Sequence, residues 1–148
     1  MESHPGPTLG AIWVILPEEK IVFVGDAVMK GQPPFLAHAD LPAWLEALNL
    51  LMSPEYKGFT VVSGRGGVAA PQTIRSQYDT IKHIHEKVDA LGKKRSSIIA
   101  TEKLAENLLK EFRAPAAKHK QYAHRLSYGL YHYYMRHYLP SSRTLVEE

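Results

Sequence analysis

The chain has 148 residues, of which 45% are hydrophobic and 22% charged, a composition that suits one folded domain and excludes a disordered chain. No apolar run approaches the roughly 18 residues of a membrane span, and the absence of cysteine excludes disulfides, thiol catalysis and cysteine-based zinc sites. Residues 1–10 carry neither a basic start nor a hydrophobic stretch, so we expect no secretory signal, a cytoplasmic location and no membrane partner.

Charge is divided unevenly between the two halves of the chain. Residues 1–71 carry four basic and seven acidic side chains, whereas residues 72–148 carry 14 basic and eight acidic ones and six of the eight histidines. A basic half is compatible with nucleic-acid binding, but an excess of this size is typical of a solvated helical surface. We therefore do not expect nucleic acid to be the main partner.

The first predicted elements form a hairpin. Two apolar runs, at 11–16 and 21–24, are separated by the turn sequence Pro-Glu-Glu-Lys at 17–20, which predicts two antiparallel strands. Neither run alternates with polar residues. Both faces of these strands are therefore expected to be covered.

A helix and a third strand follow. Asp40 is a predicted N-cap with Pro42 in the first turn, and the residues after it repeat at helical spacing: Leu41, Trp44, Leu45, Leu48 and Leu51. Ser53 and Pro54 are expected to end this helix. A strand is predicted at 59–62, and it leads into a glycine-rich loop at 63–67.

Everything after Pro71 has helical periodicity. We predict a helix over 72–91 that ends at Gly92, a second helix capped by Thr101, and a third from Pro115 to about Leu139. The predicted organisation is a half-domain over 1–92, a helical extension over 93–140 and a flexible tail over 141–148.

Two candidate metal ligands lie at the boundaries of predicted strands. His4 precedes the first strand in the segment His-Pro-Gly-Pro-Thr-Leu-Gly, and Asp26 follows Val-Phe-Val-Gly at the end of the second. Imidazole and carboxylate ligands suit zinc, iron or manganese.

The order of these motifs over residues 3–67 resembles the C-terminal half of the metallo-β-lactamase fold. The resemblance implies an α/β protein that forms half of an αββα sandwich, a short β-sheet with covering helices, followed here by the helical extension. It implies hydrolase ancestry, with His4 corresponding to the family's third metal-binding histidine and Asp26 to its bridging aspartate. In the family, a His-x-His-x-Asp-His segment and a Pro-Gly-His-Gly loop supply the remaining ligands.

The sequence departs from that family at two points. It contains no His-x-His-x-Asp-His segment, and the final histidine loop has Arg65 where the family has a ligand. A guanidinium has no lone pair for a metal, so we expect no cofactor at full occupancy unless a second chain supplies further ligands for zinc, iron or manganese. Gly64, Arg65 and Gly66 would instead form an anion-binding loop, or Arg65 would pair with an acid such as Asp26; the ion pair is the favoured interpretation.

Half of a two-sheet sandwich leaves one sheet face without a cover. We expect that face to consist of Trp13, Ile15, Val22 and Val24, or of the alternate residues Ile12, Val14, Ile21 and Phe23, and to pair with a second copy of the chain. The C-terminal helix interleaves tyrosines with basic residues, which indicates packing or a subunit interface that includes Tyr131 and Tyr134. Substrate contact and base stacking are the alternatives for this helix.

The function expected from these observations is that of a relative of metal-dependent hydrolases that is catalytically incomplete as a single chain and forms a homodimer. One alternative is a scaffold module that completes a partner carrying the missing half. A nucleic-acid binder that uses the basic helices is the other alternative. The sequence does not indicate a substrate, because one scaffold of this kind supports many.

Overall fold

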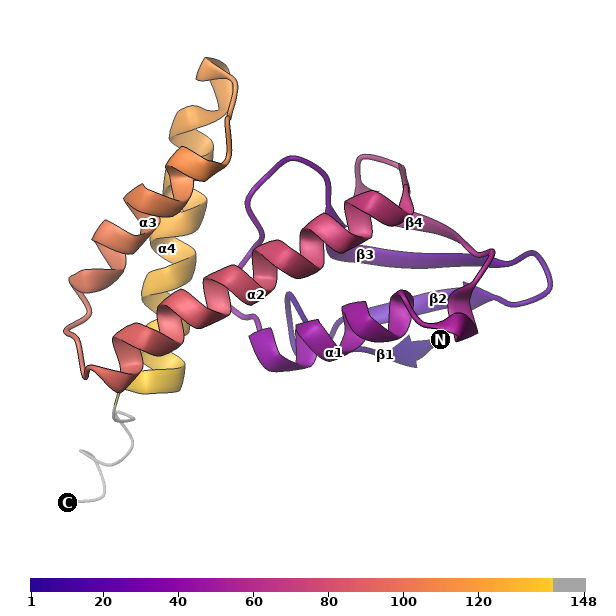
Figure 1. Ribbon diagram of the computed structural model, residues 1–148, viewed down its shortest axis with the longest axis horizontal. Helices are drawn as coiled ribbons and strands as arrows, with labels where there is room; N and C mark the ends of the chain where they lie inside the picture. Colours follow the sequence, from indigo (N-terminus) through magenta and orange to yellow (C-terminus); the bar gives the residue numbers. More distant parts are fainter. Residues whose placement is uncertain (140–148) are drawn as a thin grey trace.

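The computed structural model describes residues 1–139, which form an α/β fold with one mixed sheet and four helices (Figure 1). Along the sheet, the strands lie in chain order: β1 (Glu2–Ser3), β2 (Ile12–Leu16), β3 (Ile21–Met29), β4 (Thr60–Arg65) and β5 (Val68–Ala69). The helices are α1 (Leu41–Leu51), α2 (Pro71–Lys93), α3 (Ala100–Glu111) and α4 (His119–Tyr138), with 3-10 turns at Pro54–Tyr56 and Ala116–Lys118. The predicted α/β class is confirmed. The tail predicted at 141–148 lies outside the described residues.

The predicted hairpin is confirmed, although its second strand is longer than expected. β2 and β3 are antiparallel, with Val14 opposite Phe23. β3 then passes Gly25, whose φ is +57°, and continues to Met29, with shifts of register against β4 on both sides of Gly25. A glycine in the left-handed region allows a strand to bulge and continue. Asp26 therefore lies inside a bulged strand and not at its end.

Helix α1 connects β3 to the parallel strand β4 and packs on the sheet. The predicted N-cap is confirmed, since the Asp40 carboxylate accepts a hydrogen bond from the Ala43 amide at 2.9 Å. Trp44 is fully buried, and its indole N–H donates to the carbonyl of Ala27 in β3 at 3.0 Å. This contact fixes the helix to the strand that carries Asp26.

Two predicted helix boundaries are wrong. Gly92 lies inside α2, where a Cβ would collide with the Tyr138 ring, so this glycine permits close packing of α4 and does not end the helix. Helix α3 begins at Ala100, before Thr101, and the buried Thr101 hydroxyl donates to the Ile98 carbonyl at 2.7 Å. Tertiary packing decides both positions.

Helices α1 and α2 lie across one face of the sheet, as Figure 1 shows. Trp13 and Val22 beneath them are completely buried, Val24 nearly so, and Ile15 packs partly buried against the same core. The expectation that these four residues form an uncovered interface is therefore wrong. Successive residues of a strand point to opposite faces of the sheet. Because these apolar runs do not alternate with polar residues, the sequence does not show which set of residues faces the helices.

The predicted glycine loop at 63–67 is mostly a hairpin. β4 extends through Arg65, and β5 returns antiparallel to it, with Val62 opposite Val68. Gly66 and Gly67 form the turn with φ of +107° and +73°, values that favour glycine. The predicted anion-binding loop of Gly64, Arg65 and Gly66 is thus the end of a strand and the first residue of its turn.

Candidate functional site

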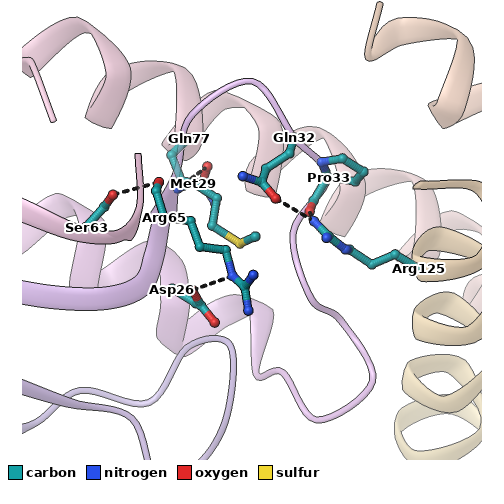
Figure 2. Close-up of polar contacts among 8 residues, drawn as sticks. All are labelled: Asp26, Met29, Gln32, Pro33, Ser63, Arg65, Gln77 and Arg125. Atoms are coloured by element: carbon teal, nitrogen blue, oxygen red, sulfur yellow. Dashed lines mark hydrogen bonds and ion pairs between the residues drawn. The ribbon is translucent and has the colours of Figure 1, made fainter. Parts of the chain in front are cut away.

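An ion pair between β3 and β4 marks the candidate site. The Arg65 Nε donates to the Asp26 carboxylate at 3.1 Å, and both side chains are partly exposed (Figure 2). Gly64 allows this approach, because a Cβ there would lie 3.2 Å from the Asp26 Oδ1. The favoured prediction, that Arg65 pairs with Asp26, is confirmed.

A second arginine reaches the same region from α4. Arg125 is buried and donates to the Gln32 side-chain oxygen at 2.9 Å and to the Pro33 carbonyl at 2.8 Å (Figure 2). These bonds hold the loop between β3 and α1 against α4. Burial lowers the pKa of Arg125, and the nearby Arg65 lowers it further. The guanidinium nevertheless stays charged at neutral pH.

Phe35 lies close to both guanidinium groups. Its ring centre is 4.9 Å from the Arg65 guanidinium carbon and 4.2 Å from that of Arg125. Cations over an aromatic face are attracted to its negative quadrupole. Phe35 therefore helps to hold two like charges at one place.

These residues line a cavity of about 840 Å³, which we call the arginine cavity. Besides the two arginines, Asp26 and Phe35, its wall includes His38, His124 and Tyr128 and apolar side chains such as Ile12, Val24 and Leu36. Asp26 is the only carboxylate on this wall among the described residues. The cavity thus combines apolar walls with an excess of positive charge.

The His4 backbone amide donates to the carbonyl of Ala11, a residue of the cavity wall, but the His4 side chain makes other contacts. Its ring packs on Trp13 in a tilted arrangement, with ring centres 3.9 Å apart, and its Nε2 contacts the Glu2 carboxylate at 2.9 Å. It does not belong to the wall of the arginine cavity. The contacts of the His4 ring are thus with Trp13 and Glu2, and none of them is with Asp26.

The donor set around Asp26 does not fit a metal ion. The carboxylate already accepts a hydrogen bond from Arg65, and the second charged neighbour, Arg125, also has no lone pair to donate. Within residues 1–139, no group of three or more histidine, aspartate or glutamate side chains is close enough together to hold a metal. No chemical step through a metal can be derived from this arrangement.

The uncovered side of the sheet carries a row of apolar side chains, which we call the open face. The exposed fractions are 51% for Ile12, 38% for Val14, 38% for Leu16, 42% for Phe23 and 66% for Val68. Strand register places Val14 beside Phe23, while Ile21 and Val62, both partly buried, continue the row across β3 and β4. The open face is thus formed by the alternate set of residues.

The C-terminal helix is mainly a packing element. Tyr122, Tyr133 and Tyr134 are buried, and the Tyr134 hydroxyl donates to the carbonyls of Leu91 and Ser96. Tyr134 is therefore core and not interface, which corrects that part of the prediction. Tyr131 is 42% exposed, so its predicted interface role stays a prediction.

Sequence reasoning did not assign roles to Phe35 or to the arginines of α4. Arg136 donates to the carbonyls of Ala37 and Ala39, so this arginine and Arg125 both hold the loop before α1. The sequence feature that pointed to α4 was a basic residue at every few positions among its aromatic residues. It does not indicate which carbonyl groups, more than 90 residues away in the chain, will be contacted.

No helix in the part of the chain that the structure describes is long and apolar enough to cross a membrane. Comparison of the chain with models of known protein families found no match, and neither did comparison with curated proteins.

Proposed function

We propose that the chain is the C-terminal half of a metallo-β-lactamase-like sandwich that no longer performs hydrolysis by itself and acts as an assembly module. In this proposal the open face packs against the open face of a second copy, so that two sheets with outer helices rebuild the layers of the full sandwich. The observation that carries the proposal is the row of exposed apolar side chains on a sheet whose other face is closed by α1 and α2.

The energy available from covering this face supports pairing. Removing roughly 400 Å² of apolar surface from water on each copy would contribute about 20 kcal/mol before costs. Association costs about 4–15 kcal/mol in lost translational and rotational freedom. The balance is favourable at the low end of this cost range, whereas at the high end nearly the whole open face must be covered.

A second copy is the partner that the open face fits best. None of the side chains that the strands contribute to the open face is charged. They are Ile12, Val14 and Leu16 on β2, Ile21 and Phe23 on β3, Thr60 and Val62 on β4, and Val68 on β5. An uncharged, apolar surface presents no like-charge repulsion to its own copy across a two-fold axis. A partner that carries the other half of the sandwich would present different chemistry and is the competing outcome of the test.

Loss of hydrolysis is proposed from the residues around Asp26. By the sequence resemblance, Arg65 stands where the family has a metal ligand. Arg65 bonds to Asp26, and His4 packs on Trp13. Zinc, iron or manganese would bind only with ligands from another chain. We accordingly propose that a single chain purified without chelator contains far less than one metal per chain and does not hydrolyse esters, lactams or phosphodiesters.

Light scattering of the purified full chain tests the assembly. We expect a mass of two chains for the natural sequence and of one chain for Phe23→Asp, because a buried carboxylate on the open face is strongly unfavourable. Ile99→Asp is the matched control: Ile99 is also exposed but lies before α3, far along the chain from the open face, and should leave the dimer intact. A folded monomer of the natural sequence at micromolar concentration would contradict the proposal.

A further inference from the structure

We propose that the arginine cavity binds a small organic monoanion, with a carboxylate on the Arg65 guanidinium and an apolar body along the walls of the cavity. The arginine cavity adjoins the open face at Ile12, which belongs to both, whereas Arg65, Arg125, Asp26 and Phe35 belong to the cavity and not to the open face. The inference stands whether or not two copies pair, and the test below measures the two separately.

The charged side chains around the cavity favour a ligand with one negative charge. Arg65 and Arg125 contribute two positive charges, and Asp26, the only carboxylate on the described wall, balances one of them. Arg125 is buried, so water compensates its charge poorly, and the remaining positive charge favours an anionic ligand. A dianion such as phosphate would exceed this balance and would be repelled by Asp26.

Arg65 has donor groups free for a ligand. Only its Nε bonds to Asp26, and neither of its Nη atoms has an acceptor within residues 1–139. Its side chain is about half exposed, which leaves these donors accessible. A guanidinium presents two parallel N–H groups that match the two oxygens of a carboxylate.

Arg125 supports the charge without being a second docking group. Its Nη1 is already bonded to Gln32 and Pro33, and the residue is buried. In Figure 2 the side chains of Arg65 and Arg125 extend toward the same space from opposite sides, from β4 and from α4. Arg125 therefore raises the local potential while Arg65 makes the contact.

The walls select an organic ligand. Ile12, Leu36 and Tyr128 supply apolar surface next to Phe35, which lies against both arginines. A cavity of about 840 Å³ is of the size that holds a small organic molecule, and apolar walls with a few polar groups are typical of such sites. Inorganic anions would leave most of this surface without contact.

Calorimetric titration of the full chain with octanoate tests the inference, with octanamide as the uncharged analogue and inorganic phosphate as the small anion. We expect saturable binding of octanoate at a single site, and at least about 10-fold weaker binding of octanamide, because the charge-assisted hydrogen bonds are lost. Phosphate should bind more weakly than octanoate. Octanamide binding as tightly as octanoate, phosphate binding more tightly, or no saturable binding of octanoate would each overturn the proposal.

Two variants at the ion pair are expected to change affinity in opposite directions. Arg65→Gln should weaken octanoate binding at least about 10-fold, whereas Asp26→Asn should strengthen it about five-fold by removing a competing carboxylate. A merely structural role of the pair predicts loss in both variants, and that result would contradict the inference.

Arg75→Gln is the matched control. Arg75 also pairs with an aspartate, Asp79, but it lies on the surface of α2 and is not part of the cavity wall, so this variant should bind octanoate like the natural protein. Light scattering of each variant distinguishes the two proposals, because the measured mass reports on pairing of two copies. A variant that loses octanoate binding but keeps the mass of the natural protein has changed the cavity and not the pairing.

Discussion

The two faces of the sheet are formed by alternate residues of the same strands, and they differ in what covers them. On one face Trp13 and Val22 are buried beneath α1 and α2, whereas on the other Val14 and Phe23 remain partly exposed although they are equally apolar. The strands therefore have the composition of a sheet covered on both sides, while the helices of this chain cover one side. The apolar composition of the strands thus does not predict which face of the sheet the helices cover.

The largest loss of stability is expected from a substitution on the face of the sheet that the helices cover. Trp13→Ala should lower the free energy of unfolding by about 3–5 kcal/mol, because it opens a cavity beneath the helices. Ile12→Ala, on the open face, should cost less than about 1 kcal/mol in the Phe23→Asp background, where the proposed pairing is absent. Urea unfolding of both variants measures the difference, and equal losses would remove the distinction between the faces.

A smaller effect is expected where α4 is packed against α2, one of the two helices that cover the sheet. Gly92→Ala should cost about 1–3 kcal/mol, because the added methyl group collides with the Tyr138 ring. Ala90→Gly, at an exposed position of the same helix, provides a comparison in which only helix propensity changes, by about 1 kcal/mol. Thermal unfolding distinguishes the two, and a neutral or stabilising Gly92→Ala would contradict the close contact.

The covered side should also respond to high pH through Tyr133. Burial raises the pKa of this phenol to about 12, so the neutral form is favoured in the folded state and its stabilisation is complete below pH 10. As the pH rises from 10 toward 12, we expect stability to fall, by about 1.4 kcal/mol at about pH 11.

Urea unfolding across this pH range measures the effect of Tyr133. In Tyr133→Phe the corresponding part of the decline should disappear, whereas Tyr131→Phe, at an exposed position of the same helix, should retain it. An unchanged decline in Tyr133→Phe would show that this phenol is not the cause.

The smallest effect on stability is expected at the ion pair beside the arginine cavity. Because both side chains are partly exposed, Arg65→Gln should change the free energy of unfolding by less than about 1 kcal/mol. Chemical denaturation measures this, and a loss comparable with that of Trp13→Ala would make Arg65 a structural residue.

Much of the fold could be predicted from local chemistry, and the failures lie where distant parts of the chain meet. The turn at 17–20, the Asp40 cap and the pairing of Arg65 with Asp26 follow from patterns within the sequence. The choice between Trp13 and Ile12 as core does not, because both lie in an uninterrupted apolar run and the helices decide between them.

The candidate site was less predictable than the fold. Asp26 and Arg65 were identified, but the metal-ligand interpretation of Asp26 depended on His4 as a second ligand, and the structure packs the His4 ring on Trp13. Phe35 and Arg125 enter the cavity from a loop and a helix about 90 residues apart in sequence. No local pattern connects two such residues.

Thiol accessibility on the open face tests the central claim most directly, because the chain has no cysteine of its own and one introduced thiol is a unique probe. Val14→Cys places that thiol on the open face, and Ile99→Cys places it on an exposed position outside the face. Reaction with a maleimide should slow markedly for the thiol at position 14 as protein concentration rises, while the rate at position 99 stays constant. Equal, concentration-independent rates at the two positions would show that no second copy covers the open face.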